Sequence, residues 1–338
     1  MHTGAAQRAF AAGILAACLV ALPGARAQAP QLNQPPTPPQ EQTEKIQKPL
    51  QIQANVVNLF VTVRDKHNAI LGDLNKEDFH VYEDGKEQKI EFYSKEVNLP
   101  LTMGLLVDTS GSMERMLPSE QSTASMFLER VMKKGDLTML ITFDEDADLL
   151  VDFTSSIAEL ERGLNRARVN EPFAPVTPGT VPNNNPRGTV FYDAVYLAAR
   201  ERLSTEVGRR AIIVLTDAVD EGSRYRLEEA IEAAQRADAV VHVLLIYDPG
   251  YFFMQGSGAG VAHKMAEETG GRMIEVKGAK HLDEAFAQLA EELRSQYSVG
   301  YYSSNQVHDG RYRKVKVEVT RQDAKVLARK GYYAPREK

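Results

Sequence analysis

The chain has 338 residues, enough for two domains or for one domain with an extension. Its hydrophobic fraction of 43% and its charged fraction of 25% are ordinary for a folded globular protein. A formal net charge of -6 argues against bulk electrostatic attraction to nucleic acid or to anionic lipid.

The first 27 residues resemble an export signal. Arg8 precedes the apolar run AFAAGILAACLVAL, Pro23 and Gly24 end this run, and the small-x-small triplet ARA precedes Gln28. The run is too short to span a bilayer comfortably, and no later run approaches the required length. We therefore expect residues 1–27 to be a signal peptide. We also expect a protein without a transmembrane segment, located in the periplasm or outside the cell.

The single cysteine, Cys18, lies inside this apolar run. The segment LAAC that it ends resembles a bacterial lipoprotein box, in which the cysteine carries the lipid anchor. The run continues as LVAL, where a lipoprotein would have a polar tether, so anchoring at Cys18 is the weaker alternative. In both cases the mature protein has no disulfide, and its stability depends on burial of a core.

Two segments of different composition follow the signal. Residues 28–48 are rich in proline and glutamine and poor in apolar residues, so we expect a disordered linker. Residues 49–98 have the pattern of strands, and FHVYEDGKEQKIEFYS predicts a hairpin with its turn at Asp84 and Gly85. These strands are too few to be stable alone, so we expect an N-terminal β module that needs a partner.

Strands alternate with helices over residues 99–297. The apolar runs LTMGLLVD, LTMLITF, RRAIIVLTD and AVVHVLLIYD predict buried strands, and segments such as SEQSTASMFLERVMKK and SRYRLEEAIEAAQRA have helical period. Strands that are apolar on both faces predict a mostly parallel sheet with helices on both sides. The expected fold class is therefore α/β, with a Rossmann-like sheet.

The pattern returns to strands over residues 298–338. YSVGYYS, RYRKVKVEVT and KVLARKGYYA have strand character, with a turn at HDG. We expect this C-terminal β segment to pair with the N-terminal β module. The α/β domain would then be inserted between two halves of one small, sandwich-like, all-β module.

Three loops of the α/β domain carry similar polar residues. DTSGS at 108–112 ends one strand, RGT at 187–189 begins a helix, and TD at 216–217 ends a later buried strand. In an open parallel sheet, ligands bind beyond the carboxyl ends of the strands, near the change in strand order. We expect five oxygen-bearing side chains to meet at that edge: Asp108, Ser110, Ser112, Thr189 and Asp217.

Oxygen-only ligands suit a hard cation, Mg²⁺ first, with Mn²⁺ and Ca²⁺ as alternatives. The hydroxyls are neutral, and the two carboxylates roughly balance the charge of a dication. Mg²⁺ commonly keeps water molecules that another ligand can replace, so an Asp or Glu carboxylate of a partner protein could complete the site. Gly111 and Gly188 are expected to support the loops, Gly111 because so tight a turn needs the freedom of glycine.

The pattern Asp-x-Ser-x-Ser, with a distant threonine and a distant aspartate, resembles the metal-ion-dependent adhesion site (MIDAS) of von Willebrand factor type A domains. The flanking segments GTVFYDAV and ETGGR are similar to that family, and the resemblance covers about residues 99–297. The order of β module, type A domain and β tail, with the ending RKGYYAP, resembles a bacterial exported subgroup. The resemblance implies metal-bridged adhesion to an acidic residue of a protein partner.

Simpler interpretations of the same residues stay open. Ser110, Ser112 and Thr189 could cap helices, and Asp217 could be an ordinary turn residue. The family often has Asp-Gly where this chain has Asp217-Ala218. Because alanine does not easily adopt a positive φ, the geometry of this loop is an open point.

Two other functions stand against adhesion: a structural envelope protein with a vestigial metal site, and a metal-dependent hydrolase. A phosphatase of the haloacid dehalogenase type would need an aspartate at Ser110 as general acid, and serine cannot act so at neutral pH. No G-x-S-x-G motif supports a serine hydrolase.

Other polar segments have simple interpretations. GSGAG at 256–260 lacks the lysine of a phosphate-binding loop, and the acidic run 144–148 reads as a solvated turn. His242 reads as a core or edge residue of a strand. We therefore expect no catalysis.

Overall fold

The structure is a computed structural model, and it describes residues 56–95, 99–169, 188–246, 258–277 and 281–336. The expected signal peptide, the Pro/Gln-rich linker and the long loop 170–187 lie outside the described residues. In the described ranges, none of the helices has the length and apolar composition that crossing a membrane requires.

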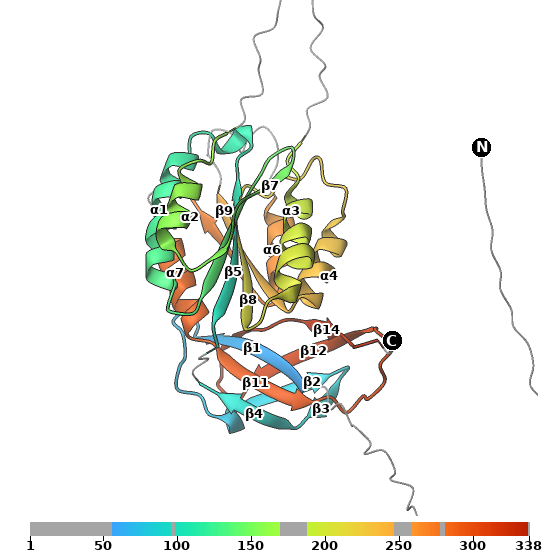
Figure 1. Cartoon of the computed structure of the whole chain (residues 1–338). Coiled ribbons are helices and arrows are strands. Elements are labelled where there is room, and N and C mark those ends of the chain that lie inside the picture. Colours follow the sequence, from blue (N-terminus) through green and yellow to red (C-terminus); the bar gives the residue numbers. More distant parts are fainter. Residues whose placement is uncertain (1–55, 96–98, 170–187, 247–257, 278–280, 337–338) are drawn as a thin grey trace, which may run out of the picture. The chain divides into compact units, whose positions relative to one another are not determined.

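A six-stranded sheet forms the centre of the α/β part (Figure 1). Its strands are β5 (Leu101–Asp108), β6 (Leu137–Phe143), β7 (Ala147–Thr154), β8 (Arg209–Thr216), β9 (Ala239–Ile246) and β10 (Met273–Val276). The strand order is β10-β9-β8-β5-β6-β7, and every neighbouring pair is parallel except β6 and β7. The predicted α/β fold with a mostly parallel, Rossmann-like sheet is therefore confirmed.

Helices cover both faces of this sheet (Figure 1). One face carries α1 (Leu117–Val131), α2 (Ile157–Leu164) and α7 (Leu282–Arg294), and the other carries α3 (Phe191–Leu197), α4 (Leu227–Arg236) and α6 (Ala259–Thr269). Each face buries its own core. In the first core, the rings of Phe127 and Phe286 lie 4.6 Å apart. In the second, Phe143 and Phe191 stack at 6.1 Å. The sheet is therefore buried on both sides, as its continuous apolar strands require.

The remaining strands form two four-stranded antiparallel sheets (Figure 1). They are β1 (Val56–Arg64), β2 (Phe79–Glu83), β3 (Lys86–Gln88), β4 (Ile90–Ser94), β11 (Tyr297–Tyr302), β12 (Tyr312–Val319), β13 (Lys325–Leu327) and β14 (Gly331–Tyr333). The strand orders are β13-β1-β11-β4 and β14-β12-β2-β3, so each sheet combines strands from before and after the α/β part. The predicted hairpin is confirmed: β2 pairs with β3, and Asp84 and Gly85 both have the positive φ that such two-residue turns need.

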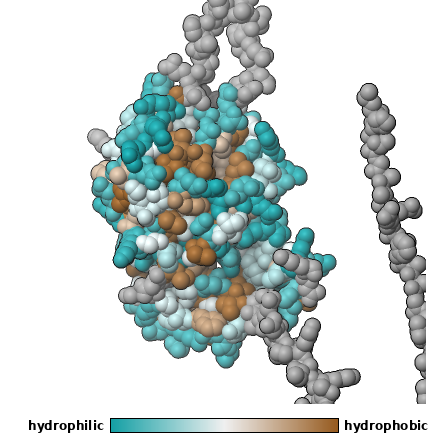
Figure 2. Space-filling view, viewed as in Figure 1, coloured by the Kyte–Doolittle hydropathy of each residue, from teal (hydrophilic) through white to brown (hydrophobic). Residues whose placement is uncertain are grey.

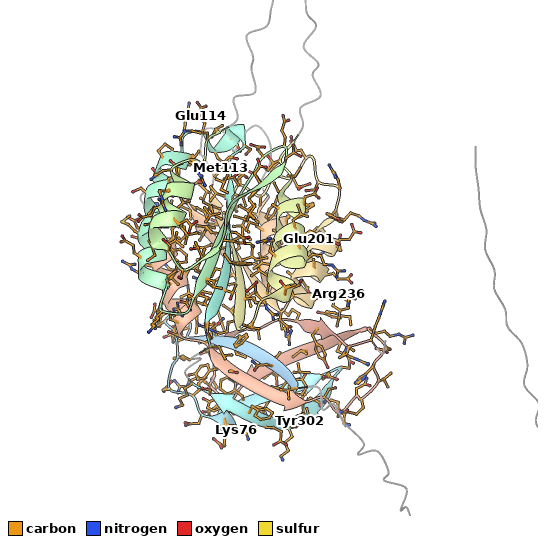
Figure 3. The ribbon with its side chains drawn as sticks, in the orientation of Figure 1. Lys76, Met113, Glu114, Glu201, Arg236 and Tyr302 are labelled. Carbon is orange, nitrogen blue, oxygen red and sulfur yellow. The ribbon has the colours of Figure 1, made fainter. Side chains whose placement is uncertain are left out.

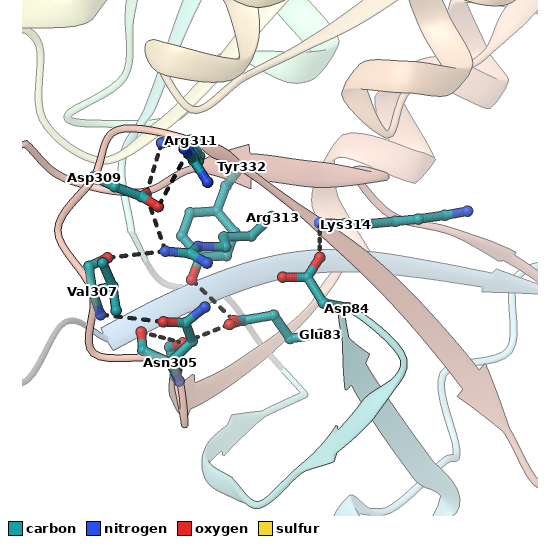
Figure 4. A network of polar contacts seen from close by, with 10 residues as sticks. Glu83, Asp84, Asn305, Val307, Asp309, Arg311, Arg313, Lys314 and Tyr332 are labelled. Atoms are coloured by element: carbon teal, nitrogen blue, oxygen red, sulfur yellow. Dashed lines mark hydrogen bonds and ion pairs between the residues drawn. The ribbon is translucent and has the colours of Figure 1, made fainter.

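A buried carboxylate ties these two sheets together. Glu83, at the end of β2, is 3% exposed. It accepts hydrogen bonds from the hydroxyls of Tyr301 at 2.9 Å and of Ser303 at 2.6 Å. The hydroxyl of Tyr332 donates a third at 2.9 Å (Figure 4). Because Tyr301 belongs to β11 of the other sheet, this network fixes one sheet against the other.

Hydrophobic side chains also reach the surface, over both the α/β part and the β sheets (Figure 2). Phe92 of β4 and Tyr302 of β11 are 47% and 42% exposed, with their rings edge to face at 5.6 Å. Small exposed groups of this kind are normal on folded proteins and carry no functional conclusion.

A cluster of buried charges joins β1 to the α/β part. Arg64 of β1 forms a 2.7 Å ion pair with Glu292 of α7, and Arg272 approaches the same carboxylate at 3.4 Å. His242 of β9 is 1% exposed, and in the described part of the chain neither ring nitrogen has a hydrogen-bond partner. His242 was expected in the core or at an edge of the sheet, and it lies in the core.

Burial lowers the pKa of His242 to about 4; the nearby Glu292 opposes this shift, and the arginines add to it. The unfolded chain, with a histidine pKa near its ordinary value, takes up the proton first as the pH falls. Above about pH 6.5, His242 is neutral in both states and does not reduce the free energy of unfolding. As the pH falls toward 4, this histidine lowers the free energy of unfolding by roughly 3 kcal/mol.

We expect His242→Leu to remove this part of the pH dependence, measured by urea unfolding at several pH values. His263→Gln changes a histidine that is 64% exposed, and it should leave the pH dependence as in the wild type. An unchanged pH profile in His242→Leu would mean that other groups cause the loss of stability in acid.

Candidate metal centre

The candidate site lies at the carboxyl ends of β5 and β8, two adjacent parallel strands in the middle of the sheet. The register pairs Val107 with Leu215, so Asp108 and Thr216 end their strands side by side. The chain continues from β5 to β6 on one side, whereas β8 lies on the other side. The strand order therefore reverses here, which is where open α/β sheets bind ligands.

The first loop lies far from the β sheets. Met113 and Glu114, which directly follow Ser112, are at the opposite end of the described structure from Lys76 and Tyr302 (Figure 3). A ligand at this edge would therefore approach the α/β part alone.

Asp108 is completely buried at the end of β5. Its Oδ1 accepts a hydrogen bond from the backbone N–H of Ser110 at 2.9 Å, and its Oδ2 accepts one from the hydroxyl of Thr216 at 2.6 Å. Burial and the negative charge of Asp217 raise the pKa of Asp108 to about 7, although the bonds from Ser110 and Thr216 oppose this shift. A carboxylate in such a place is stabilised by a nearby cation.

The two serines connect this loop to Asp217. The hydroxyl oxygens of Ser110 and Ser112 lie 3.0 Å apart. Burial raises the pKa of Asp217, and a hydrogen bond from the Ser112 side chain partly opposes that effect. The structure therefore brings Asp108, Ser110, Ser112 and Asp217 together at one point.

The capping interpretation of the serines and of Thr189 is wrong. Ser110 precedes a short 3-10 turn at Gly111–Met113, but its side chain makes no capping hydrogen bond. The N-cap of α1 is Met116, and that of α3 is Val190. The hydroxyls at 110, 112 and 189 therefore do not cap the N-terminus of a helix.

Thr189 lies in the loop before α3. Its carbonyl oxygen accepts hydrogen bonds from the backbone of Glu221 at 3.1 Å and of Gly222 at 3.3 Å. Within the described ranges, its hydroxyl forms no hydrogen bond with the other four predicted residues. Gly188 allows the two loops to approach, since a Cβ there would lie 2.0 Å from the Cβ of Glu221. Arg187 lies outside the described residues.

One expectation about the backbone was wrong, and one open point has an answer. Gly111 is not among the described residues with positive φ, so its turn does not depend on the special freedom of glycine. Ala218 has a φ of 59°, although alanine disfavours this conformation by about 1–2 kcal/mol. Its N–H donates to the hydroxyl of Thr216 at 2.9 Å, and its side chain is 1% exposed, so the surroundings hold it there. Strain of this kind is common at binding sites.

The structure adds one residue that the sequence interpretation missed. Glu120, in the first turn of α1, is completely buried. Its pKa is raised well above the usual range, first by burial and then by the charges of Asp108 and Asp217. The helical period could have found it, because Leu117, Glu120 and Ala124 are three and four residues apart and share one face.

The donors at this edge fit a hard dication. They are the buried carboxylate of Asp108, the partly buried carboxylate of Asp217 and neutral hydroxyls, and no ion pair of the described residues includes Asp108 or Asp217. In the described chain, no group of three or more His, Cys, Asp and Glu side chains could hold a metal ion. The set proposed here is of another kind, because it has two carboxylates and three hydroxyls. The acidic run 144–148 therefore gains no support as a second cation site.

Comparison with known proteins found one family match and several similar solved structures. The family model of the von Willebrand factor type A domain matches residues 103–220, and no curated protein matches the sequence. The conserved hypothetical protein BatB from Bacteroides thetaiotaomicron is 19% identical, with 57% of this chain and 98% of that chain covered and a TM-score of 0.43. A von Willebrand factor type A protein from Catenulispora acidiphila is 12% identical, covering 77% and 74%, with a TM-score of 0.47. Proximal thread matrix protein 1 from the mussel byssus, in a structure with a zinc-occupied MIDAS motif, is 14% identical, covering 62% and 49%, with a TM-score of 0.46.

Proposed function

Because residues 103–220 belong to the von Willebrand factor type A domain family, we propose that this chain binds a partner protein through a divalent cation. The family often mediates protein interactions. The observation that carries the proposal is the pair of carboxylates at this edge, Asp108 completely buried and Asp217 partly buried. They share one point with the hydroxyls of Ser110 and Ser112, and no ion pair of the described residues includes either carboxylate.

The proposed ligands of the cation are Asp108, Ser110, Ser112, Thr189 and Asp217, with Gly188 in a supporting loop. When bound, Mg²⁺ would supply a coordination position that a carboxylate can occupy, and Mn²⁺ and Ca²⁺ are the alternatives. The two aspartates balance the charge of the cation, and the neutral hydroxyls add none. Because the site with its cation has no excess negative charge, an Asp or Glu side chain of the partner can occupy the open coordination position.

We propose binding without catalysis. Ser110 stands where a phosphatase of the haloacid dehalogenase type needs its general acid, and its hydroxyl has the Ser112 hydroxyl as its neighbour. A vestigial site in a structural protein is the other alternative, and metal titration separates it from adhesion.

Export and the domain bounds are also part of the proposal. The signal peptide at 1–27 and the linker at 28–48 lie outside the described residues. The antiparallel pairing of β1 with β11 and of β2 with β12 supports a β module made from 49–98 and 298–338, with the type A domain at 99–297 inserted between them.

A metal-dependent pull-down tests the function. Immobilised protein should retain envelope proteins in Mg²⁺ and release them in EDTA, because the partner carboxylate is held through the cation. Asp217→Ala should retain none of them, and esterifying the carboxyl groups of the envelope fraction should abolish retention by the wild type. Equal retention in Mg²⁺ and in EDTA would refute metal-bridged binding.

A further inference from the structure

Glu120 is a buried carboxyl group without a partner. Its side chain comes from the first turn of α1 and is completely buried. In the described part of the chain, neither carboxyl oxygen has a hydrogen-bond partner. A buried polar group without a hydrogen bond destabilises the fold unless something else interacts with it. The other residues that α1 buries are apolar except Thr123, so the presence of Glu120 among them needs an explanation.

The surroundings of Glu120 show what could interact with it. Glu120 lies in the first turn of α1, and the loop that carries Asp108, Ser110 and Ser112 leads into this helix. Burial and then the charges of Asp108 and Asp217 raise the pKa of Glu120. The other acids of the site have hydrogen bonds, from Ser110 and Thr216 to Asp108 and from the backbone N–H of Val219 to Asp217. Glu120 has none, and the ion pairs of the described residues do not include it.

We propose that Glu120 acts on the cation site from outside the set of ligands: its negative charge strengthens cation binding, although it is not one of the five predicted ligands. This inference rests on the proposed function, since it concerns the same cation. A cation between the aspartates would offer Glu120 the favourable charge that the protein itself does not provide. Replacing a residue that supports the metal ligands without contacting the metal commonly lowers metal affinity by about 10- to 100-fold.

The negative charge of Glu120 can act on the cation without direct coordination. A carboxylate near the two aspartates attracts a dication, and in a buried place water screens this attraction only weakly. The start of α1 assists as well, because the positive end of a helix dipole favours a carboxylate in the first turn.

Replacement of Glu120 should change metal binding and stability in opposite directions. Glu120→Met keeps the length of the side chain and removes the unpaired oxygens, so the melting temperature in EDTA should rise. The Mg²⁺ dissociation constant, measured by calorimetry on the intact protein, should increase by about 10- to 100-fold. Glu120→Gln keeps the size and polarity but removes the charge, and it should weaken Mg²⁺ binding similarly.

A matched control lies on the same helix. Glu129 is exposed, and Glu129→Gln should leave both the melting temperature and the Mg²⁺ affinity as in the wild type. Wild-type affinity in both Glu120 variants overturns the role of Glu120 while the proposed cation site stands. Absence of Mg²⁺ binding to the wild type overturns both proposals. A lower melting temperature of Glu120→Met in EDTA, with unchanged affinity, would show that Glu120 acts only in the fold.

Discussion

Replacing Asp108 with alanine is expected to abolish Mg²⁺ binding. Asp108 is completely buried at the end of β5 and is one of only two carboxylates among the five proposed ligands. Its loss leaves one carboxylate among the ligands of a dication. The Mg²⁺ affinity should therefore fall by more than the roughly 10- to 100-fold that follows the loss of a residue outside the ligand set. Calorimetric titration with Mg²⁺ measures this directly.

Two further variants make the result specific. Asp108→Asn keeps the volume and one acceptor oxygen for the Thr216 hydroxyl, so it should stay folded and still lose Mg²⁺ binding. Asp148→Ala removes an exposed carboxylate from β7 and should bind Mg²⁺ as the wild type does. Equal Mg²⁺ binding by the wild type and Asp108→Ala would contradict the proposed site.

Replacing Glu292 with glutamine is expected to destabilise the fold by about 3–5 kcal/mol, because it leaves buried positive charges without their partner. The carboxylate of Glu292 is 1% exposed and pairs with Arg64 at 2.7 Å and with Arg272 at 3.4 Å. The Arg64 side chain is itself only 4% exposed, so water cannot replace the lost partner. Urea unfolding at neutral pH should show a lower midpoint.

The neighbouring residue supplies the control for this prediction. Glu291 is exposed on the same helix, so Glu291→Gln should change the free energy of unfolding by less than about 0.5 kcal/mol. If both variants unfolded at the same urea concentration, the ion pair between β1 and α7 would not contribute to stability.

The position of the candidate site could be predicted because the residues involved follow apolar strands directly. The strand LTMGLLVD ends at Asp108, and RRAIIVLT ends just before Asp217. Parallel strands place their carboxyl ends at one edge, so two distant segments are expected to meet there. No local pattern reports the backbone conformation of a single loop residue. The expectation for Gly111 was therefore wrong, and the conformation of Ala218 stayed open until the structure gave its φ.

Glu120 and His242 were harder to interpret for a related reason. The periodicity places both residues in elements with a buried face, and His242 was indeed expected in the core or at an edge. The partners of each come from other elements: Asp108 and Asp217 from two strand ends, and Glu292 from α7. A pKa shift or a missing hydrogen bond depends on these partners, which the order of residues along one helix or strand does not specify.

The sequence alone determined the class of the fold and the edge of the sheet where polar loops gather, because both follow from hydrophobic periodicity along the chain. Only the tertiary structure decided that Glu120 is buried without a partner beside the two aspartates and that Ala218 has a positive φ. It likewise decided that Arg64 reaches Glu292 from a strand 228 residues away. These features arise when separate elements pack together, and contacts between distant segments are set by the shape of the whole core rather than by any one segment.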